Sequence, residues 1–408
     1  MPRGGLAPWA LFSGLIAAAG LPIYIHAPKV YADDYGVPLA SLGAALFGLR
    51  LLDVVQDPLL GWLAERTRAR RGWMVAGAVA LLALSMLGLF AVVPPVAPLV
   101  WFALMLTGLF SAFSFLTIAF YAEGVAKAGR MGPGGHLRLA GWRETGALVG
   151  VSLAAVAPVA LAGVTNAPFA GFALGFAGLA VLAAWAMRNE WTGGGAAPTG
   201  GLRPVLADPL ARRLLLIALV NAAPVAVTST LFLFFVESRL GAPGWEGPLL
   251  LLFFLSAAAS APGWTRLAAR FGEKRVLLAA MMLAIVTFAF AATLGRGDTL
   301  AFALICLGSG AAMGADLTLL PALFARLMSV IAPQAAAGFG LWSFVSKFAL
   351  AFAAVTLLPL LQAAGFAGPA SPDSALRLLS TLYALVPCAL KLIAVALLLA
   401  TPVTEETP

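Results

Sequence analysis

The segment Leu46-Phe-Gly-Leu-Arg-Leu-Leu-Asp-Val-Val-Gln-Asp-Pro-Leu-Leu-Gly-Trp-Leu-Ala-Glu-Arg-Thr-Arg-Ala-Arg-Arg-Gly72 places charges inside an apolar helix and ends in a basic hairpin. Arg50, Asp53, Asp57 and Gly61 are spaced three, four and four residues apart, so they share one helical face. An ionised carboxylate near the middle of a bilayer costs about 2.5–3.5 kcal/mol on insertion scales, and a second one facing it adds to that cost. The two aspartates therefore indicate a cation or proton site; the alternative is that they only pair with Arg50 and a partner helix.

The composition predicts a helical protein that crosses a membrane many times. The chain has 408 residues, of which 62% are hydrophobic and 10% charged, with a mean hydropathy of +0.99. These values exclude a soluble domain, and the long uninterrupted apolar runs exclude the alternating pattern of a membrane barrel. The net charge of +8 does not indicate a nucleic-acid partner, because the charges lie in short loops on one side. Cys306 and Cys388 fall inside predicted helices, so we expect neither a disulfide nor a metal cluster.

Twelve membrane spans are predicted, in two six-helix halves. The expected spans are 8–29, 39–64, 73–93, 98–125, 139–162, 167–188, 211–236, 247–268, 275–294, 299–325, 337–363 and 374–400. The first apolar run continues into a full span, so no cleavable signal is expected. Most Lys and Arg residues fall on the predicted inner side, and the predicted outer side has only Lys29, Arg239, Arg296 and Arg377, which indicates cytoplasmic termini.

The two halves resemble each other weakly. Gly61-Trp at the end of the second span is echoed by Gly263-Trp at the end of the eighth, and both pairs precede basic residues. We therefore divide the chain into an N-terminal bundle (1–188), a Gly- and Pro-rich cytoplasmic linker (189–210) and a C-terminal bundle (211–408). Duplicated bundles that rock about a central cavity bind their substrate near the bilayer midplane.

The pattern Arg50-x-x-Asp53-x-x-x-Asp57-Pro58-x-x-Gly61, followed by Arg66, Arg70 and Gly72, resembles the second helix of the glycoside-pentoside-hexuronide:cation symporters. These form a melibiose permease-like branch of the major facilitator superfamily. The resemblance implies the major facilitator fold and a secondary active transporter that works by alternating access. It also implies that Asp53 and Asp57 bind the coupling cation, Na⁺ or H⁺.

Further site residues follow from the same resemblance. Ser114 matches a hydroxyl residue that completes the cation site, and Gln56 stands where the family often has another amide. Lys347 matches a lysine opposite the paired aspartates, so Lys347 and Arg50 are expected to couple the cation to the rest of the site. The hairpin residues are expected to latch the cytoplasmic ends of the helices, although plain loop topology explains any single arginine equally well: Gly61, Arg66, Arg70 and Arg71.

Polar and aromatic residues inside other spans are candidates for the substrate cavity: Tyr24, His26, Thr117, Tyr121, Trp142, Arg143, Asp316, Trp342 and Lys391. Arg143 stands where the family carries a buried arginine. Asp316 and Lys391 match no family motif, and they either pair with each other or contact substrate. For His26 a hydrogen-bonding role is favoured over a proton relay.

The substrate site departs from the family pattern. Ala17 and Thr117 occupy the positions at which the family uses carboxylates to bind sugar hydroxyls, which argues against a glycoside held in the usual way. We expect cation-coupled solute symport across a bacterial inner membrane, by a monomer without a cofactor. The alternative is a transporter or flippase for a lipid-like amphiphile, and a membrane sensor is a weaker third reading. No catalytic or nucleotide motif is present, so the chain is not expected to be an enzyme.

Overall fold

The computed structural model describes residues 5–191, 202–331, 336–366 and 368–402. The described residues are almost entirely helical, and ten of their helices are long and apolar enough to cross a membrane. The first predicted span corresponds to α1 (Ala7–Ala18) and α2 (Leu21–Asp33) together. The second corresponds to α3 (Leu39–Arg66), which carries the charged face. All twelve predicted spans therefore have helical counterparts, and the all-helical fold class is confirmed.

The backbone contacts divide the chain into two compact units. Unit 1 comprises Met1–Val205 and Met328–Phe344, and unit 2 comprises Leu206–Leu327 and Val345–Pro408. Residues 328–331 and 336–344, at the end of one long helix and the start of the next, belong to unit 1, and the division of the chain into two six-helix halves stays a prediction. The predicted linker, 189–210, includes residues 192–201, which lie outside the described residues, so its role stays a prediction.

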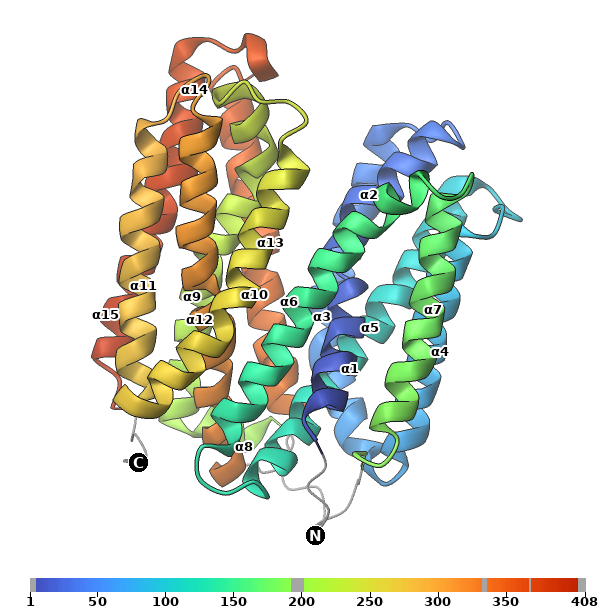
Figure 1. Cartoon of the computed structure of the whole chain (residues 1–408), viewed down its shortest axis with the longest axis vertical. Coiled ribbons are helices and arrows are strands. Elements are labelled where there is room, and N and C mark those ends of the chain that lie inside the picture. The colour runs from blue at the N-terminus through green and yellow to red at the C-terminus, as the bar shows by residue number, and fades with distance from the viewer. Residues whose placement is uncertain (1–4, 192–201, 332–335, 367, 403–408) are drawn as a thin grey trace. The chain divides into compact units, whose positions relative to one another are not determined.

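Unit 1 contains the first seven α-helices, which run roughly lengthwise through it in Figure 1. Their bounds are α1 (Ala7–Ala18), α2 (Leu21–Asp33), α3 (Leu39–Arg66), α4 (Arg71–Phe90), α5 (Pro98–Gly129), α6 (Gly135–Ala162) and α7 (Pro168–Met187), with the short η1 (Arg68–Arg70) between α3 and α4 and the start of α8 (Arg203–Ala207) at the unit's boundary. The first predicted span is interrupted: α1 ends before Gly20, and Pro22 lies in the first turn of α2, where its missing N–H costs nothing.

Glycines let α1 and α6 touch along their backbones. A Cβ atom added to Gly146 would collide with the backbone of Ala10, and one added to Gly150 would collide with the backbone of Gly14. The Gly146-x-x-x-Gly150 spacing puts both glycines on one face of α6, a common arrangement where membrane helices pack closely. This contact fixes α6, and with it Arg143 and Glu144, against the first helix.

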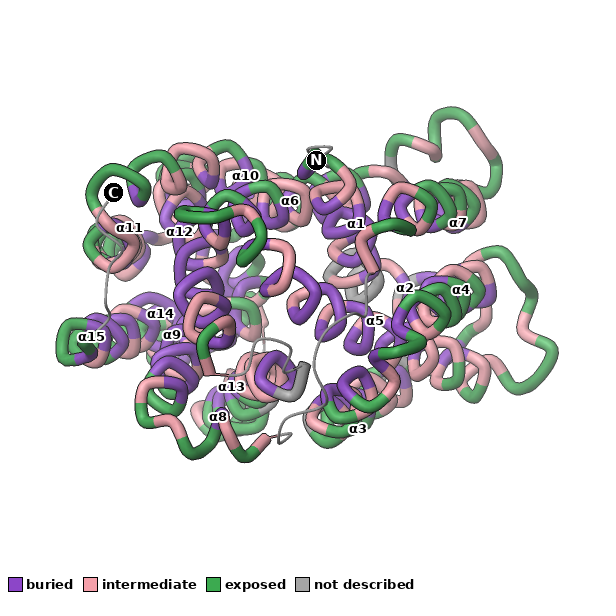
Figure 2. The backbone as a smooth tube through the Cα atoms, turned by 90° about the horizontal axis from the view of Figure 1, so that it is seen from below, coloured by how far each residue is buried: buried purple, intermediate pink, exposed green. Residues whose placement is uncertain are grey.

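Unit 2 contains the helices that follow α8. Their bounds are α9 (Pro209–Phe234), η2 (Phe235–Arg239), α10 (Glu246–Phe271), α11 (Glu273–Ala289), η3 (Phe290–Thr293), α12 (Thr299–Ile331), α13 (Ala336–Ala363), η4 (Gly368–Ala370), α14 (Asp373–Ser380), η5 (Thr381–Leu385) and α15 (Val386–Leu399). Half of the apolar stretch in α9 and in α12 is buried, against 22% in α10, so α9 and α12 are central to the unit. Figure 2 shows buried residues along α12 and mostly exposed or intermediate residues on α11, whose apolar stretch is 28% buried.

The core of unit 2 is built around two π-helical turns. Phe235 in η2 stacks on Tyr383 in η5, with ring centroids 4.2 Å apart and planes 14° from parallel. Phe302 of α12 packs on both rings. These aromatic contacts hold α9, α12 and the last span together.

Candidate functional site

Asp53 and Asp57 lie on α3 and are both buried, with 2% and 0% of their surface exposed. The amide nitrogen of Gln56 donates a 2.8 Å hydrogen bond to Oδ1 of Asp53. The amide oxygen of Gln56 accepts a 2.9 Å hydrogen bond from the hydroxyl of Ser111 on α5. The carboxylate pair is therefore enclosed in unit 1 with Gln56 beside Asp53, and the assignment of Gln56 to a cation site stays a prediction.

The first turns of α13 reach the second aspartate. The hydroxyl of Ser343 donates a 2.6 Å hydrogen bond to Oδ2 of Asp57. A Cβ on Gly340, one turn earlier, would lie 3.0 Å from the carbonyl oxygen of Asp57 and 3.3 Å from Cα of Gly61. Gly340 and Gly61 thus allow α13 to approach α3 closely enough for Ser343 to reach the carboxylate. The sequence analysis missed both Ser343 and Ser111.

Helix α5 contributes the other hydroxyl groups of this region. Ser114 is buried, and it lies three residues after Ser111 and so on the same side of the helix. Thr117 donates a 2.7 Å hydrogen bond to the carbonyl oxygen of Phe113 in its own helix. The role of Thr117 in a substrate site likewise stays a prediction. The assignment of Ser114 to a cation site stays a prediction.

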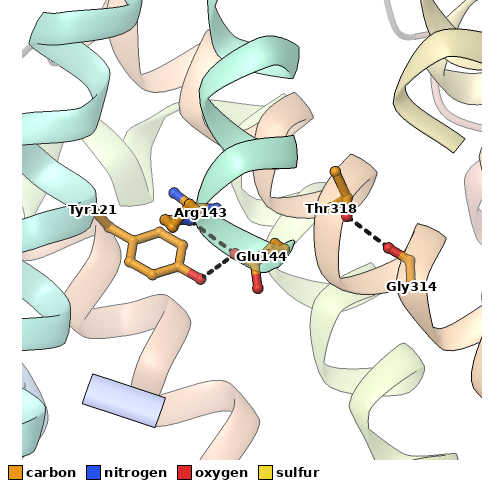
Figure 3. Close-up of polar contacts among 5 residues, drawn as sticks. All are labelled: Tyr121, Arg143, Glu144, Gly314 and Thr318. Atoms are coloured by element: carbon orange, nitrogen blue, oxygen red, sulfur yellow. Dashed lines mark hydrogen bonds and ion pairs between the residues drawn. The ribbon is translucent and has the colours of Figure 1, made fainter. Parts of the chain in front are cut away.

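Tyr121, Arg143 and Glu144 form one buried cluster, drawn in Figure 3. Oε1 of Glu144 accepts hydrogen bonds from Nε of Arg143 at 2.8 Å and from the hydroxyl of Tyr121 at 3.0 Å. The guanidinium carbon of Arg143 lies 3.7 Å from the centre of the Tyr121 ring. Nη2 of Arg143 is buried and has no hydrogen-bond partner among the described residues, so it is free to donate to a ligand. Glu144 was not singled out from the sequence as a site residue.

The basic hairpin contains two buried arginines, Arg68 and Arg71, and two exposed ones, Arg66 and Arg70. Nη1 of Arg71 lies 2.9 Å from Oε2 of Glu123 on α5, and both side chains are almost fully buried. Arg66 is exposed and lies over the Trp62 ring at 5.1 Å, and Arg70 is also exposed. Of the predicted latch residues, Arg71 and the closely packed Gly61 are therefore the ones fixed by contacts. Glu123, the partner of Arg71, was not assigned to the latch from the sequence.

The remaining cavity candidates differ in their surroundings. Nε2 of His26 lies 3.4 Å from the carbonyl oxygen of Ala155, which is the hydrogen-bonding role that the sequence favoured. Trp142 is 51% exposed, so it does not line a closed cavity within unit 1. Trp342 on α13 is half-buried. Tyr24 and Arg50 lie outside the residues whose side chains the structure describes.

Asp316 and Lys391 form an ion pair in the interior of unit 2. The ammonium of Lys391 donates to Oδ2 of Asp316 and, at 2.7 Å, to the amide oxygen of Asn221. Helices α12, α15 and α9 supply the three residues. Of the two alternatives left by the sequence, pairing is what the structure shows. Lys347 also belongs to unit 2, so its position opposite Asp53 and Asp57 stays a prediction.

Within the described ranges, no three His, Cys, Asp or Glu side chains gather where they could hold a metal ion. Any cation near Asp53 and Asp57 would have to be held by these two carboxylates together with amide, hydroxyl or backbone oxygens. Such hard oxygen ligands suit Na⁺, and the same carboxylates suit a proton.

Comparison with known proteins places the chain in a family. Residues 11–405 match the family described as MFS/sugar transport protein, where MFS denotes the major facilitator superfamily. The chain therefore belongs to this family of membrane transporters. The resemblance on which the sequence analysis relied, and the expectation that the chain is not an enzyme, are thus confirmed at the level of the superfamily.

Two further likenesses agree with this placement. The chain is 40% identical over 53 residues to the inner membrane symporter YicJ of Escherichia coli (strain K12), a match that covers 12% of each protein. A bacterial homologue of the iron transporter ferroportin, solved in an outward-facing state, superposes with a TM-score of 0.73 at 18% identity over 97% of this chain and 98% of the homologue. The same homologue with soaked iron superposes with a TM-score of 0.71 at 16% identity, again over 97% of this chain and 98% of the homologue. These structural likenesses concern the fold alone.

Proposed function

We propose that the protein is a cation-coupled symporter that moves a solute by alternating access, with Na⁺ or H⁺ bound at Asp53 and Asp57. The observation that carries this proposal is the burial of both carboxylates one turn apart on α3. Two buried negative charges at that separation repel each other strongly, so a bound cation or proton stabilises the pair. Lys347 is proposed to offset one of the two negative charges, which leaves room for one monovalent cation, and Arg50 is proposed to couple that cation to the rest of the site.

The solute is proposed to bind near Arg143 rather than through carboxylates. The buried Nη2 of Arg143 offers a donor to an oxygen of the solute, and Tyr121 and Glu144 hold the guanidinium in place. Thr117 and Ala17 stand where carboxylates would bind sugar hydroxyls, which disfavours glycosides. The match to an inner membrane symporter and the loop charge pattern support an inner-membrane location with cytoplasmic termini.

The test is transport by the full-length protein in liposomes. A thermal-shift screen over sugars, carboxylates and lysolipids, with and without Na⁺, first identifies a solute that stabilises the protein. Uptake of that solute is then driven by an imposed Na⁺ or H⁺ gradient in the wild type, Asp53→Asn, Asp57→Asn and the exposed control Asp34→Asn. Both buried variants should keep downhill exchange and lose uphill accumulation, whereas the control should accumulate normally. Concentrative uptake in both buried variants would refute the proposal.

A further inference from the structure

Unit 2 contains a pocket that the proposed cation coupling does not use. It holds about 500 Å³ of empty space, including the part that opens to the outside, and is lined by residues of α9, α10, α11, α12 and α15. Most of the lining is apolar, with Phe253, Ile285, Phe288 and Met313 among the larger side chains. Asp316 and Lys391 also line it. The pocket therefore combines an apolar body with one charged pair, which is the usual make-up of a small-molecule site.

The charged pair has open hydrogen-bonding capacity. Asp316 and Lys391 are 7% and 5% exposed, and Oδ1 of Asp316 is buried without a hydrogen-bond partner among the described residues. An ammonium carries three N–H groups, and the contacts of Lys391 with Asp316 and Asn221 use two of them. A buried acceptor left without a donor is energetically unfavourable, so a ligand that supplies the donor is stabilised at this position.

The charge balance of the pair limits which head groups the pocket can bind. Asp316 and Lys391 together are neutral, and a charged head group would leave an uncompensated charge in an apolar pocket. A neutral group that both donates and accepts would satisfy Asp316 and Lys391 at once. Hydroxyl and carboxamide groups have this property.

We propose that this pocket binds a neutral amphiphile. Its hydroxyl or amide head donates to Oδ1 of Asp316 and accepts from the ammonium of Lys391, and its apolar body packs against Phe253, Ile285 and Phe288. The proposal stands on unit 2 alone and does not depend on cation binding at Asp53 and Asp57.

The first experiment compares probes that share one apolar body. Full-length protein in lipid nanodiscs is titrated calorimetrically with 3-phenylpropan-1-ol, 3-phenylpropanamide, 3-phenylpropylammonium, 3-phenylpropanoate and propylbenzene, with empty nanodiscs as the reference. The alcohol and the amide should bind at least about tenfold more tightly than the other three, as expected for one well-made hydrogen bond. Tightest binding of a charged probe, equal binding of propylbenzene, or no binding of any probe would overturn the proposal.

Three variants locate the binding. Ala284→Leu fills the pocket, and Ala289→Leu on the same helix adds the same bulk at an exposed position that does not line the pocket. The double variant Asp316→Leu/Lys391→Leu removes both charges together, so it leaves no unpaired buried charge. Ala284→Leu should lose at least about tenfold in alcohol affinity and Ala289→Leu should not. The double variant should bind the alcohol and propylbenzene equally, and retained preference for the alcohol would show that the pair does not recognise the head group.

Discussion

Ser343 donates its hydroxyl proton to Oδ2 of Asp57 across 2.6 Å, although the two residues lie 286 positions apart in the sequence. Ser343 lies in the part of α13 that packs with unit 1, and Lys347, about one turn further on, lies in the part that packs with unit 2. The hydroxyl that binds Asp57 therefore belongs to a helix whose first turns pack with unit 1 and whose later turns pack with unit 2.

Ser343 should compete with the coupling cation for Asp57. A hydrogen bond to a charged group contributes about 1.5–3 kcal/mol, so removing it in Ser343→Ala should strengthen cation binding by about tenfold. The same change should lower thermal stability in the absence of cation. Thr107→Ala is the matched control, because the Thr107 hydroxyl donates to the carbonyl oxygen of Ala103 in its own helix, far from Asp57 in the sequence. Unchanged cation affinity in calorimetric titration of Ser343→Ala would show that the serine and the cation do not compete.

The buried pair of Arg71 and Glu123 should matter far more to stability than an ion pair nearer the surface. Glu123→Gln leaves a buried guanidinium without its carboxylate and should cost on the order of 3–5 kcal/mol in the free energy of unfolding. Glu190→Gln breaks the more exposed pair with Lys127 and should cost less than about 1 kcal/mol. Denaturant unfolding in detergent measures both, and equal losses would contradict the assignment of the latch to Arg71.

The sequence predicted the helices well because apolar runs set their positions. The second span was expected at 39–64 and α3 covers Leu39–Arg66, and the fourth was expected at 98–125 and α5 covers Pro98–Gly129. The break between α1 and α2 was missed, since Gly20 and Pro22 lie inside one apolar run. A hydropathy profile does not detect such a local break in the backbone of a helix.

The site was harder to predict than the helices. Two carboxylates and an arginine inside an apolar helix are conspicuous, because charge there is costly. Ser111 and Ser343 are not conspicuous, because a hydroxyl is common in membrane helices and its partner lies on another helix. For Ser343, the signal available in the sequence was Gly340, which lies about one turn earlier on the same helix. The pairing of Asp316 with Lys391 could be named only as one of two alternatives.

Sugars should not bind tightly to this transporter. Because Ala17 and Thr117 replace the carboxylates and the Thr117 hydroxyl is engaged within its own helix, sugar hydroxyls would lack two strong acceptors. A site built to hydrogen-bond a hydroxyl prefers that ligand to one without the hydroxyl by about 10⁴-fold or more, and a site without those groups lacks this preference. Calorimetric titration with common galactosides and pentosides should therefore show no binding tighter than millimolar. One tightly bound glycoside would overturn this expectation.

Lys347 should couple to the helix that carries the aspartates. Lys347→Ala leaves excess negative charge near Asp53 if the family resemblance holds, and it should change cation affinity. Combining it with Asp53→Asn should then be less harmful than the two losses added together, with an interaction energy of at least about 0.5 kcal/mol. A double-mutant cycle on cation affinity measures this energy. Strict additivity would place Lys347 away from the carboxylate pair.

The central claim is that Asp53 and Asp57 together hold one monovalent cation, and it is tested without knowing the solute. Purified protein is titrated calorimetrically with NaCl and with acid in buffers of different ionisation enthalpy, which counts the Na⁺ and H⁺ bound per chain. The wild type and the exposed control Asp34→Asn should each bind one such cation more than either Asp53→Asn or Asp57→Asn. Equal numbers bound by the wild type and by both buried-site variants would contradict the account.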